Sequence, residues 1–221
     1  MKKTAIIVAG GTGSRIHSQT PKQFIPIGGV PMLAYSIKTF HKYDPEIEII
    51  IAINPDFSDQ WEMLSKQSHI NNIAVKVVHG GRERFYSVQN ALNAISHATG
   101  LVAIHDAARP FVSELLIEKL FNHAEKAGCA IPAIPIKDSI RAHVMDEWVP
   151  ADRTLFRSIQ TPQVFDIEKL KSSYHQPFEP KFTDDATVFE SAGNKIYLIE
   201  GEEINFKITT EKDLDYAEFI A

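Results

Sequence analysis

The segment Ala5-Ile6-Ile7-Val8-Ala9-Gly10-Gly11-Thr12-Gly13-Ser14-Arg15 joins a short apolar run to a glycine-rich turn. An apolar run that ends in glycines predicts a buried β-strand followed by a loop. Because glycine has no Cβ, backbone N–H groups in such a loop can approach a phosphate closely. Arg15 and, after Pro21, Lys22 add two positive charges beside it. The segment therefore predicts a strand that ends in a triphosphate-binding loop.

Other glycine-rich loops fit this segment less well. A Walker A loop needs Gly-Lys followed by Ser or Thr at a fixed spacing, and the segment lacks it. A dinucleotide-binding fingerprint needs a third glycine where Ile16 stands, and no acidic residue clearly ends the second predicted strand. A tight turn beside two solvated cations is the alternative without a ligand. The combination with Arg15 and Lys22 favours the phosphate site.

Apolar, β-branched runs alternate with helical patterns along the chain. This alternation predicts an α/β protein with a mostly parallel sheet and helices on both faces. Each run is nearly all apolar, as expected for strands covered on both sides. The predicted strands are residues 5–8, 47–53, 75–79, 101–105 and 130–134. Further strands are expected at 195–199 and, from an alternating pattern, at 205–208.

Helix signals occupy the intervals between these strands. Pro31 suits a first helical turn, and apolar residues recur at helical spacing from Phe85 to Ile95. Ser113 and Gly128 provide an N-cap and a stop for a third helix. Later helices are expected from about Asp166, from about Asp184 and from a cap near Thr210.

The carboxyl ends of parallel strands lie at one edge of the sheet, where ligands bind. Three loops follow predicted strand ends: the glycine-rich turn, Gly80-Gly81-Arg82, and residues 105–110 (His105-Asp106-Ala107-Ala108-Arg109-Pro110). We therefore expect all three loops at one rim. Asp106 ends a buried strand as a carboxylate, and an Asx-turn leading into Ala107-Ala108 is the structural alternative for it.

The alternation of strand and helix stops between Pro135 and Gln160. We expect a single domain over residues 1–221 with an extended β-arm at 136–160. An exposed aromatic side chain such as Trp148 is typical of a contact with another chain, so the arm is a candidate dimer contact. A mobile surface hairpin is the alternative.

The composition of the 221-residue chain limits its function. A net charge of −5 argues against a general nucleic-acid binder. The single cysteine, Cys129, excludes an intrachain disulfide and fits a reducing cytoplasm. The apolar stretch after Met1-Lys2-Lys3 is too short for a signal peptide, and no apolar run could span a bilayer. We expect a cytoplasmic protein that binds neither nucleic acid nor membrane.

Six motifs in register resemble those of sugar-phosphate nucleotidyltransferases. The first is Ala9-Gly10-Gly11-x-Gly13-x-Arg15 with Pro21-Lys22, and Gln23-Phe24 after it narrows the likeness to cytidylyltransferases of polyol phosphates. The others are Gly80-Gly81-x-x-Arg84-x-x-Ser87-Val88, Asp106-Ala107-Ala108-Arg109-Pro110, Gln160-Thr161-Pro162-Gln163-x-Phe165, Thr183-Asp184-Asp185-Ala186 and Asn205-Phe206-Lys207-Ile208-Thr209. Their order and spacing over nearly the whole chain are similar to those of the 2-C-methyl-D-erythritol 4-phosphate cytidylyltransferases.

This resemblance implies a Rossmann-like nucleotidyltransferase fold and a reaction of the non-mevalonate isoprenoid pathway. CMP would pass from CTP to 2-C-methyl-D-erythritol 4-phosphate, giving 4-diphosphocytidyl-2-C-methyl-D-erythritol and pyrophosphate. The resemblance implies catalytic roles for Arg15, Lys22, Arg153 and Lys207. The nucleotide-binding residues that it implies are Ala9, Gly10, Gly11, Thr12, Gly13, Arg15, Lys22, Gly80, Gly81 and Ser87. The acceptor-binding residues that it implies are Asp106, Arg109, Ser139, Arg153, Thr183 and Lys207, with Mg²⁺ at Asp106.

The resemblance further implies a homodimer. Ser139, where the family often has threonine, and Arg153 match arm residues that reach into the partner's site. Structural roles are the alternatives for several of these residues. Ser87 could satisfy the start of a helix, Lys207 could be solvated, and Arg109 or Arg153 could form ordinary ion pairs. Arg82 receives no role, because its position is acidic in some relatives.

Other functions compete with this assignment. Cytidylyltransferases of ribitol 5-phosphate tend to carry Arg-Asn-Glu in the Ser87-Val88 region and Asp-Ala-Val-Arg where this chain has Asp106-Ala107-Ala108-Arg109. Both differences favour methylerythritol phosphate as the acceptor. An inactive nucleotide-binding regulator would have lost Arg15, Lys22 or Lys207, and all three are present. The missing third glycine disfavours an NAD-dependent reductase.

Overall fold

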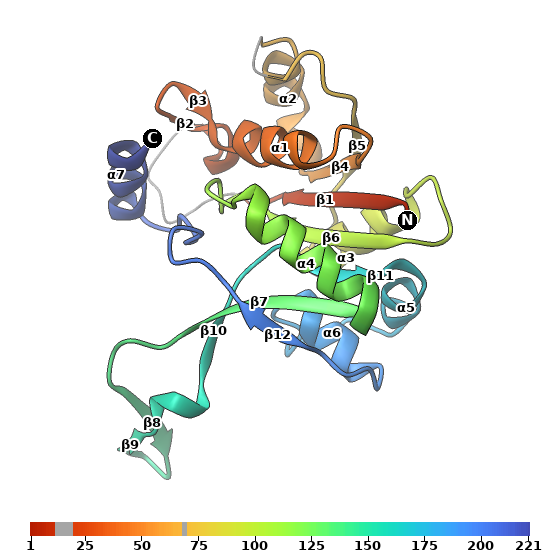
Figure 1. The fold of residues 1–221 in the computed structure, drawn as a ribbon. Helices are drawn as coiled ribbons and strands as arrows, with labels where there is room; N and C mark the ends of the chain where they lie inside the picture. Colours follow the sequence, from red (N-terminus) through yellow and green to blue (C-terminus); the bar gives the residue numbers. More distant parts are fainter. Residues whose placement is uncertain (12–19, 68–69) are drawn as a thin grey trace.

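A mixed sheet forms the centre of the computed structural model, which describes residues 1–11, 20–67 and 70–221 (Figure 1). Within these residues the sheet has eight strands in the order β10-β7-β11-β6-β1-β4-β5, with β12 paired to β7. The strands are β1 (Lys3–Ala9), β4 (Glu48–Ile53), β5 (Val75–His79), β6 (Leu101–Asp106), β7 (Cys129–Pro135), β10 (Arg157–Ile159), β11 (Gln163–Asp166) and β12 (Leu198–Glu200).

The first five predicted strands are confirmed as β1, β4, β5, β6 and β7. β1 pairs in parallel with β4 and β6, and β4 pairs in parallel with β5. The sequence did not predict β10 and β11, which run antiparallel to their neighbours and insert residues 163–166 between β6 and β7. β5 is the edge strand and is partly exposed, so the expectation that every strand is covered on both faces was wrong there.

Two predictions near the C-terminus need correction. The strand expected at 195–199 forms as β12, Leu198–Glu200. No strand forms at 205–208, although the sequence alternates there, because this segment pairs with no strand among the described residues. One backbone hydrogen bond, from Ile208 N–H to the Ala108 carbonyl (2.8 Å), holds the segment against the loop after β6. Lys207 therefore lies outside the sheet, on a segment at its rim.

The helices cover both faces of the sheet, as predicted. They are α1 (Met32–Tyr43), α2 (Ser58–Ser65), α3 (Arg84–Asn93), α4 (Glu114–Ala127), α5 (Ile167–Ser173), α6 (Asp185–Ser191) and α7 (Glu211–Ile220). Ala5, Ile7 and Ala9 of β1 pack with α1 and α4, whereas Ile6 packs with α3, α5 and α6. Figure 1 shows α1 and α4 in front of the sheet and α3 behind it. No helix in the described ranges combines the length and apolar character needed to cross a bilayer.

The predicted helix ends follow from local capping. Ser113 Oγ accepts a hydrogen bond from Leu116 N–H, and Gly128 ends α4 with a positive φ of 86°. Asp166, Asp184 and Thr210 cap α5, α6 and α7 with their side chains. These caps satisfy N–H groups that a helix start leaves without partners. The cap at Asp184 fixes the backbone between Thr183 and Asp185.

Short elements complete the chain. Lys22–Phe24 form a 3₁₀ turn, η1, followed by the small hairpin of β2 (Pro26–Ile27) and β3 (Val30–Pro31). Ile27, Met32, Ile208 and Ala217 form a separate apolar cluster that joins α7 to this hairpin. This apolar cluster holds the segment around Lys207 against the N-terminal part of the rim.

Two further 3₁₀ turns are η2 (Pro55–Phe57) and η3 (Arg153–Leu155).

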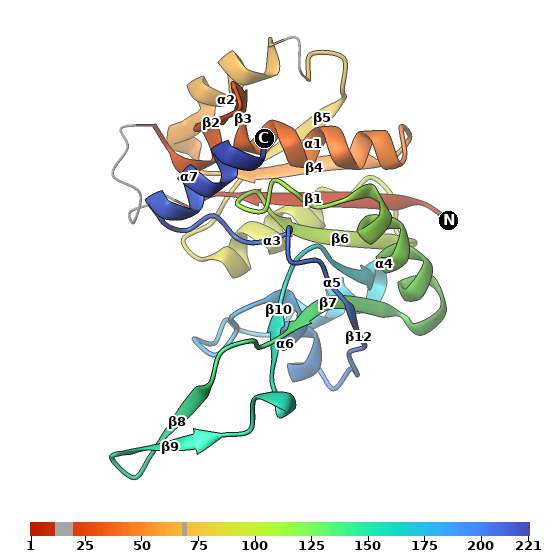
Figure 2. The ribbon, with the colours of Figure 1, turned by 60° about the vertical axis from the view of Figure 1, so that its left-hand side comes forward.

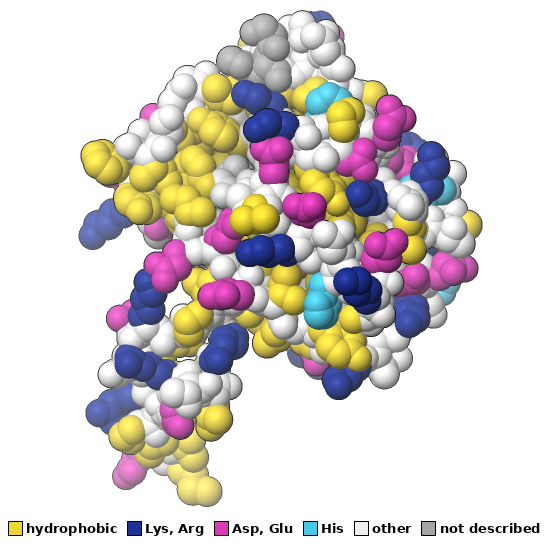
Figure 3. All heavy atoms as spheres, viewed as in Figure 1, with side chains coloured by type: hydrophobic (Ala, Val, Ile, Leu, Met, Phe, Trp, Pro, Cys, Tyr) yellow, Lys and Arg dark blue, Asp and Glu magenta, His cyan; other side chains and the backbone are white. Residues whose placement is uncertain are grey.

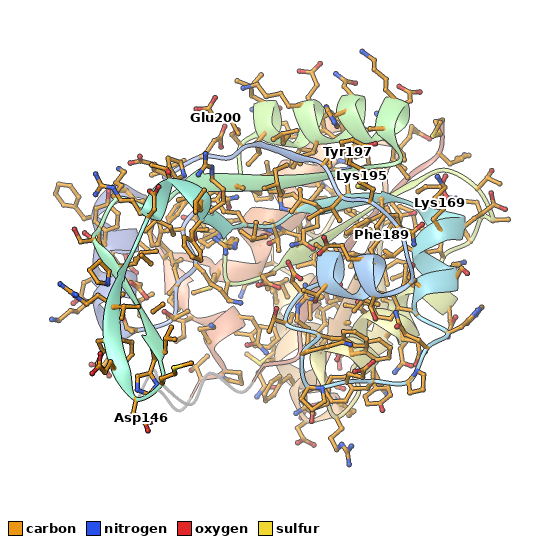
Figure 4. All side chains as sticks on the ribbon, turned by 90° about the horizontal axis from the view of Figure 1, so that it is seen from below. Asp146, Lys169, Phe189, Lys195, Tyr197 and Glu200 are labelled. Atoms are coloured by element: carbon orange, nitrogen blue, oxygen red, sulfur yellow. The ribbon has the colours of Figure 1, made fainter. Side chains whose placement is uncertain are left out.

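Between β7 and β10 the chain forms a hairpin of β8 (Ile140–Val144) and β9 (Glu147–Ala151). Figures 1 and 2 show this hairpin standing away from the sheet. Its tip carries exposed apolar side chains, with Met145 94% and Trp148 67% exposed. Figure 3 shows hydrophobic side chains on the protruding part at the lower left. Asp146 marks the tip in Figure 4. Residues 157–159 return to the central sheet as β10, so the hairpin ends earlier than the expected limit at 160.

The pairing of β1 with β6 sets the rim, because it places Val8 beside Asp106. This pairing begins where Leu101 N–H donates to the Lys2 carbonyl (3.0 Å). Gly100 lies at this contact with a φ of 131°, and a Cβ there would be 2.3 Å from the Lys2 carbonyl oxygen. Glycine is therefore required at the start of β6.

We predict that Gly100→Ala lowers the free energy of unfolding by about 3 kcal/mol or more, because steric overlap adds to backbone strain. Gly193→Ala is the matched control, since Gly193 also has a positive φ (84°), but a Cβ there would meet no atom of the described residues within 4 Å. The control should cost about 1 kcal/mol. Urea denaturation of both variants measures the difference, and equal losses would contradict this role of Gly100.

Candidate active site

Three loops meet at the carboxyl edge of the parallel strands and enclose a cavity of about 370 Å³, which we call the first cavity. Its wall includes Ala9, Gly10 and Gly11 after β1, Gly81 and Arg82 after β5, and Asp106, Ala107 and Ala108 after β6. Lys22 and Ser87 also line it. The predicted gathering of the three loops at one rim is confirmed.

A second cavity of about 360 Å³ adjoins the first. It is lined by Thr183 and Asp184 at the start of α6, by Thr161 and Gln163 around β11, and by Arg109. Arg84, Asp106 and Lys207 line both cavities. These three residues, which we call the partition, form the wall between two neighbouring spaces.

The partition consists of one carboxylate between two cations. Lys207 Nζ lies 2.6 Å from Asp106 Oδ2, and Arg84 Nε donates to Asp106 Oδ1 at 3.2 Å. Burial alone would raise the pKa of Asp106, but the charges of Arg84 and Lys207 outweigh burial and hold its pKa far below the usual range. Asp106 is therefore ionised at any pH near neutrality.

The backbone of Asp106 is fixed by a hydrogen-bond chain through Thr161. Asp106 N–H donates to Thr161 Oγ1 (3.0 Å), which lies 3.2 Å from His105 Nδ1. His105 Nε2 lies 3.1 Å from the Arg109 carbonyl, which can only accept, so Nε2 carries the proton and Nδ1 accepts from Thr161. Burial lowers the pKa of His105 to about 4, which keeps the ring neutral.

The start of η1 brings a cation to the first cavity. Lys22 Nζ donates to the Ile208 carbonyl (2.9 Å), and Gln23 Nε2 donates to the Ala9 carbonyl (2.7 Å) at the end of β1. These bonds tie η1 both to the first strand and to the segment that carries Lys207. Thr12, Gly13 and Arg15 of the predicted nucleotide site lie outside the described residues.

The loop after β5 is shaped by Ser87. Ser87 is buried, and its Oγ accepts from Gly81 N–H at 3.0 Å and lies 3.3 Å from the Glu83 carbonyl. A Cβ on Gly81 would be 2.3 Å from Tyr86 Cβ, so the close packing of this loop on α3 requires glycine. Gly80 donates its N–H to the Ile53 carbonyl (2.7 Å) and lines neither of the two cavities. Ser87 is placed to hold Gly81 at the cavity wall.

Arg109 lies in the wall of the second cavity, as a predicted acceptor-binding residue should. Its guanidinium donates to the carbonyls of Asn205 (2.8 Å) and Ile159 (3.3 Å). These bonds connect the loop after β6 to β10 and to the segment of Lys207. The buried Nε of Arg109 has no hydrogen-bond partner among the described residues.

The structure does not bring Ser139 and Arg153 to the other predicted residues of the same chain. Both line a separate cavity at the foot of the hairpin, with Arg141 and Pro150. Arg153 donates to the Lys137 carbonyl there. In one chain, the predicted site is therefore divided between the rim and the hairpin.

Sequence reasoning missed the residues that support the partition. Arg84 also binds Asp185, and Tyr174 donates its hydroxyl to the same carboxylate (2.7 Å). The signal that could have found these residues is the presence of Arg84, Asp185 and Thr161 in three of the family motifs. Their contacts join distant segments of the chain, so no local sequence pattern predicts them.

The carboxylate of Asp106, at the junction of the two cavities, is the candidate ligand for a metal ion. The residues that the structure describes contain no group of three or more His, Cys, Asp or Glu side chains that could hold a metal ion. Mg²⁺ bound with a nucleotide usually takes one or two carboxylates and completes its shell with phosphates and water. Asp106 in the wall of the first cavity fits that pattern, provided that phosphates supply most of the ligands.

Comparisons with known proteins show which family the chain is similar to. A family model described as IspD: 2-C-methyl-D-erythritol 4-phosphate cytidylyltransferase matches residues 3–221. The protein of that name from Bacteroides thetaiotaomicron is 42% identical over 215 residues, 97% of each chain. The crystal structure of 4-diphosphocytidyl-2C-methyl-D-erythritol synthase from Anaerococcus prevotii has a TM-score of 0.85 at 30% identity, covering 99% of this chain and 97% of that one. The Thermus thermophilus cytidylyltransferase has a TM-score of 0.79 at 29% identity, covering 100% and 98%. The expected nucleotidyltransferase fold is confirmed.

We predict that Thr161→Val lowers the free energy of unfolding by about 2 kcal/mol, because it leaves Asp106 N–H and His105 Nδ1 without a partner. Thr161→Ser is the matched control. It keeps the hydroxyl and should cost about 1 kcal/mol for the lost methyl group. Urea denaturation at neutral pH measures both, and a Val variant as stable as the Ser variant would contradict the hydrogen-bond chain.

Proposed function

This chain belongs to the 2-C-methyl-D-erythritol 4-phosphate cytidylyltransferase family, and we propose how its rim carries out the reaction. The enzyme transfers CMP from CTP to 2-C-methyl-D-erythritol 4-phosphate in the isoprenoid pathway. An oxygen of the acceptor phosphate attacks the α-phosphorus of CTP and forms a new P–O bond. The bond from the α-phosphorus to the bridging oxygen breaks, and pyrophosphate leaves with that electron pair.

The observation that carries the proposal is the pair of adjoining cavities with a shared charged wall. A reaction between two phosphates needs two binding spaces that meet where the bond forms. We assign the first cavity to CTP, because glycine loops and Lys22 line it, and the second to the acceptor. Arg84, Asp106 and Lys207 stand at the junction, where the reacting atoms would lie.

On the nucleotide side, Gly10, Gly11 and Gly81 offer backbone close to the ligand, and Ser87 supports Gly81. Lys22 would stabilise the charge that develops on the α-phosphate oxygens as they are attacked. Its ammonium is already oriented by the Ile208 carbonyl, so little reorganisation is needed. Arg15, by family resemblance, would act with Lys22.

On the acceptor side, Lys207 and Thr183 would hold the phosphate. Lys207 is 41% exposed at its side chain, so its ammonium can contact a ligand while it stays near Asp106. Asp106 would accept from the acceptor's hydroxyl groups, and the Arg109 guanidinium would add positive charge to the wall of the same cavity. Fixed charges on both sides of the junction would hold two anions together that otherwise repel each other.

We assign Mg²⁺ to Asp106 and the triphosphate. When bound, the ion neutralises charge on the triphosphate and on the leaving pyrophosphate. Asp106 Oδ1 and Oδ2 each already accept from a cation, but each oxygen has a second lone pair. The carboxylate can therefore serve the partition and an ion together.

We further propose that the chain is one nucleotidyltransferase domain, active in the cytoplasm as a homodimer. The hairpin supports the dimer, because its tip exposes Met145 and Trp148. At its foot, Ser139 and Arg153 line a cavity apart from the rim of their own chain. In the proposed dimer they complete the acceptor site of the partner.

We predict that loss of Lys22 and loss of Lys207 change different kinetic constants. Lys22→Ala should lower kcat by about 10²–10³-fold, as for loss of a contact that stabilises the transition state. Lys207→Ala should mainly raise the KM for the acceptor and leave the KM for CTP nearly unchanged. Lys66→Ala is the control, because Lys66 pairs with Glu62 of α2. It should change neither kcat nor the KM of either substrate.

Steady-state pyrophosphate release, with each substrate varied in turn, measures both signatures. A normal kcat for Lys22→Ala would contradict the nucleotide assignment. If Lys207→Ala raises the KM for CTP and leaves the KM for the acceptor unchanged, the CTP and acceptor cavities have been interchanged.

The dimer is tested by complementation. If Arg153 serves the partner's site, mixed dimers of Lys22→Ala and Arg153→Ala contain one doubly impaired site and one intact site. Random mixing makes half of the dimers mixed, so activity should return to about a quarter of wild type. Co-expression of the two variants, compared with each variant alone, measures the recovery. No recovery would show that Arg153 acts within its own chain.

A further inference from the structure

Arg84, the first residue of α3, joins two carboxylates from distant parts of the chain. Its Nη1 and Nη2 donate to Asp185 Oδ1 (3.0 Å) and Oδ2 (2.8 Å), in the two-pronged arrangement that arginine makes with a carboxylate. Its Nε donates to Asp106 Oδ1 (3.2 Å), and Nη2 lies at the same distance from that oxygen. Arg84 thus connects Asp185, at the start of α6, to Asp106.

Asp185 determines how the Arg84 side chain lies. The Asp185 side chain is fully buried, and a buried carboxylate is costly unless it is paired and hydrogen-bonded. Arg84 supplies the charge, and the Tyr174 hydroxyl donates a third hydrogen bond at 2.7 Å. Breaking the pair would leave a buried charge alone, so Arg84 is held in one orientation.

The surroundings of Arg84 are closely packed as well. Phe85, the next residue on α3, stacks on Tyr174 with ring centroids 4.7 Å apart and on Phe182 at 5.8 Å. Phe182 immediately precedes Thr183 of the second cavity. The same aromatic group therefore supports the anchor of Arg84 and the predicted acceptor-binding loop.

We propose that Arg84 is a positioning residue that fixes the Asp106 carboxylate in the partition, with Asp185 as its buried anchor. Nothing in the family motifs assigned Arg84 or Asp185 a role. The arrangement links the loop of the second cavity to the wall shared by both, because Asp185 follows Thr183 and Asp184 of the second cavity, while Asp106 lines both cavities. The inference deepens the proposed role of Asp106 and rests on it.

Direct phosphate binding by Arg84 fits the geometry less well. Its Nε and both terminal nitrogens already face a carboxylate at 2.8–3.2 Å. Lys22 and Lys207 present their ammonium groups to the cavities from exposed or partly exposed positions. Arg84 therefore acts on the substrates through Asp106, and this route can be tested separately from a purely structural one.

The test is a double-mutant cycle on kcat/KM with Arg84→Lys and Asp106→Asn. Lysine keeps the positive charge and can pair with Asp185, but a single ammonium cannot hold both carboxylates in the fork geometry. We expect Arg84→Lys to lower kcat/KM by about 10–100-fold, in the range expected for a misplaced reacting group. Asp106→Asn alone should lower it at least as much.

In the Asp106→Asn background, Arg84→Lys should then change kcat/KM less than about 2-fold, because no carboxylate remains to be positioned. A merely structural role would lower kcat/KM by the same factor in both backgrounds, and that result would overturn the proposal. So would a normal kcat/KM for Arg84→Lys beside an impaired Asp106→Asn. A normal kcat/KM for Asp106→Asn would instead overturn the proposed role of Asp106, and the positioning role with it.

Two further variants test the anchor and provide a control, and thermal unfolding checks that every variant is folded. Asp185→Asn keeps the shape of the anchor and removes its charge, and it should lower kcat/KM in the wild-type background but not in Asp106→Asn. Lys169→Gln is the control, because Lys169 lies on α5 at the end of the molecule opposite the hairpin (Figure 4), and it should leave kcat/KM unchanged. Thermal unfolding of every variant shows that the compared proteins are folded. Equal effects of Asp185→Asn in both backgrounds would contradict its role as the anchor.

Discussion

The site depends on one electrostatic constraint: the carboxylate of Asp106 is buried at the end of β6 and must be paired. Lys207 comes to it from the C-terminal part of the chain and Arg84 from α3, at 2.6 and 3.2 Å. Because a buried carboxylate without partners is costly, this pairing draws three distant segments to one point. The same three side chains form the wall between the two cavities. The electrostatics that hold the rim together also place opposite charges where two phosphates would react.

Much of the fold could be predicted, because buried parallel strands and capped helices leave local patterns. The apolar runs that became β1, β4, β6 and β7 and the caps at Ser113, Asp184 and Thr210 are examples. β10 and β11 were missed, since their strand character comes from pairing antiparallel with β7 and β6 rather than from an apolar run. The segment 205–208 shows the reverse case, in which an alternating pattern pairs with no strand among the described residues.

The site could be predicted where a motif carries the chemistry in one short stretch. The sequence placed Asp106 at one rim with the glycine-rich turn, and the family motifs implied binding roles for Lys22, Thr183 and Lys207. These four residues line the two cavities. It could not show that Arg84 spans Asp106 and Asp185, because that contact depends on how α3 and α6 pack against the sheet. Nor could it show that Thr161 holds the Asp106 backbone, since one hydroxyl in a loop leaves no pattern.

The most direct measurement is pyrophosphate release with CTP and Mg²⁺, with 2-C-methyl-D-erythritol 4-phosphate and ribitol 5-phosphate run side by side as acceptors. We expect rapid release with the first acceptor and little with the second. A preference for ribitol 5-phosphate would keep the fold and the chemistry but contradict the assignment of the acceptor. Release with neither would contradict the assignment of the second cavity as an acceptor site.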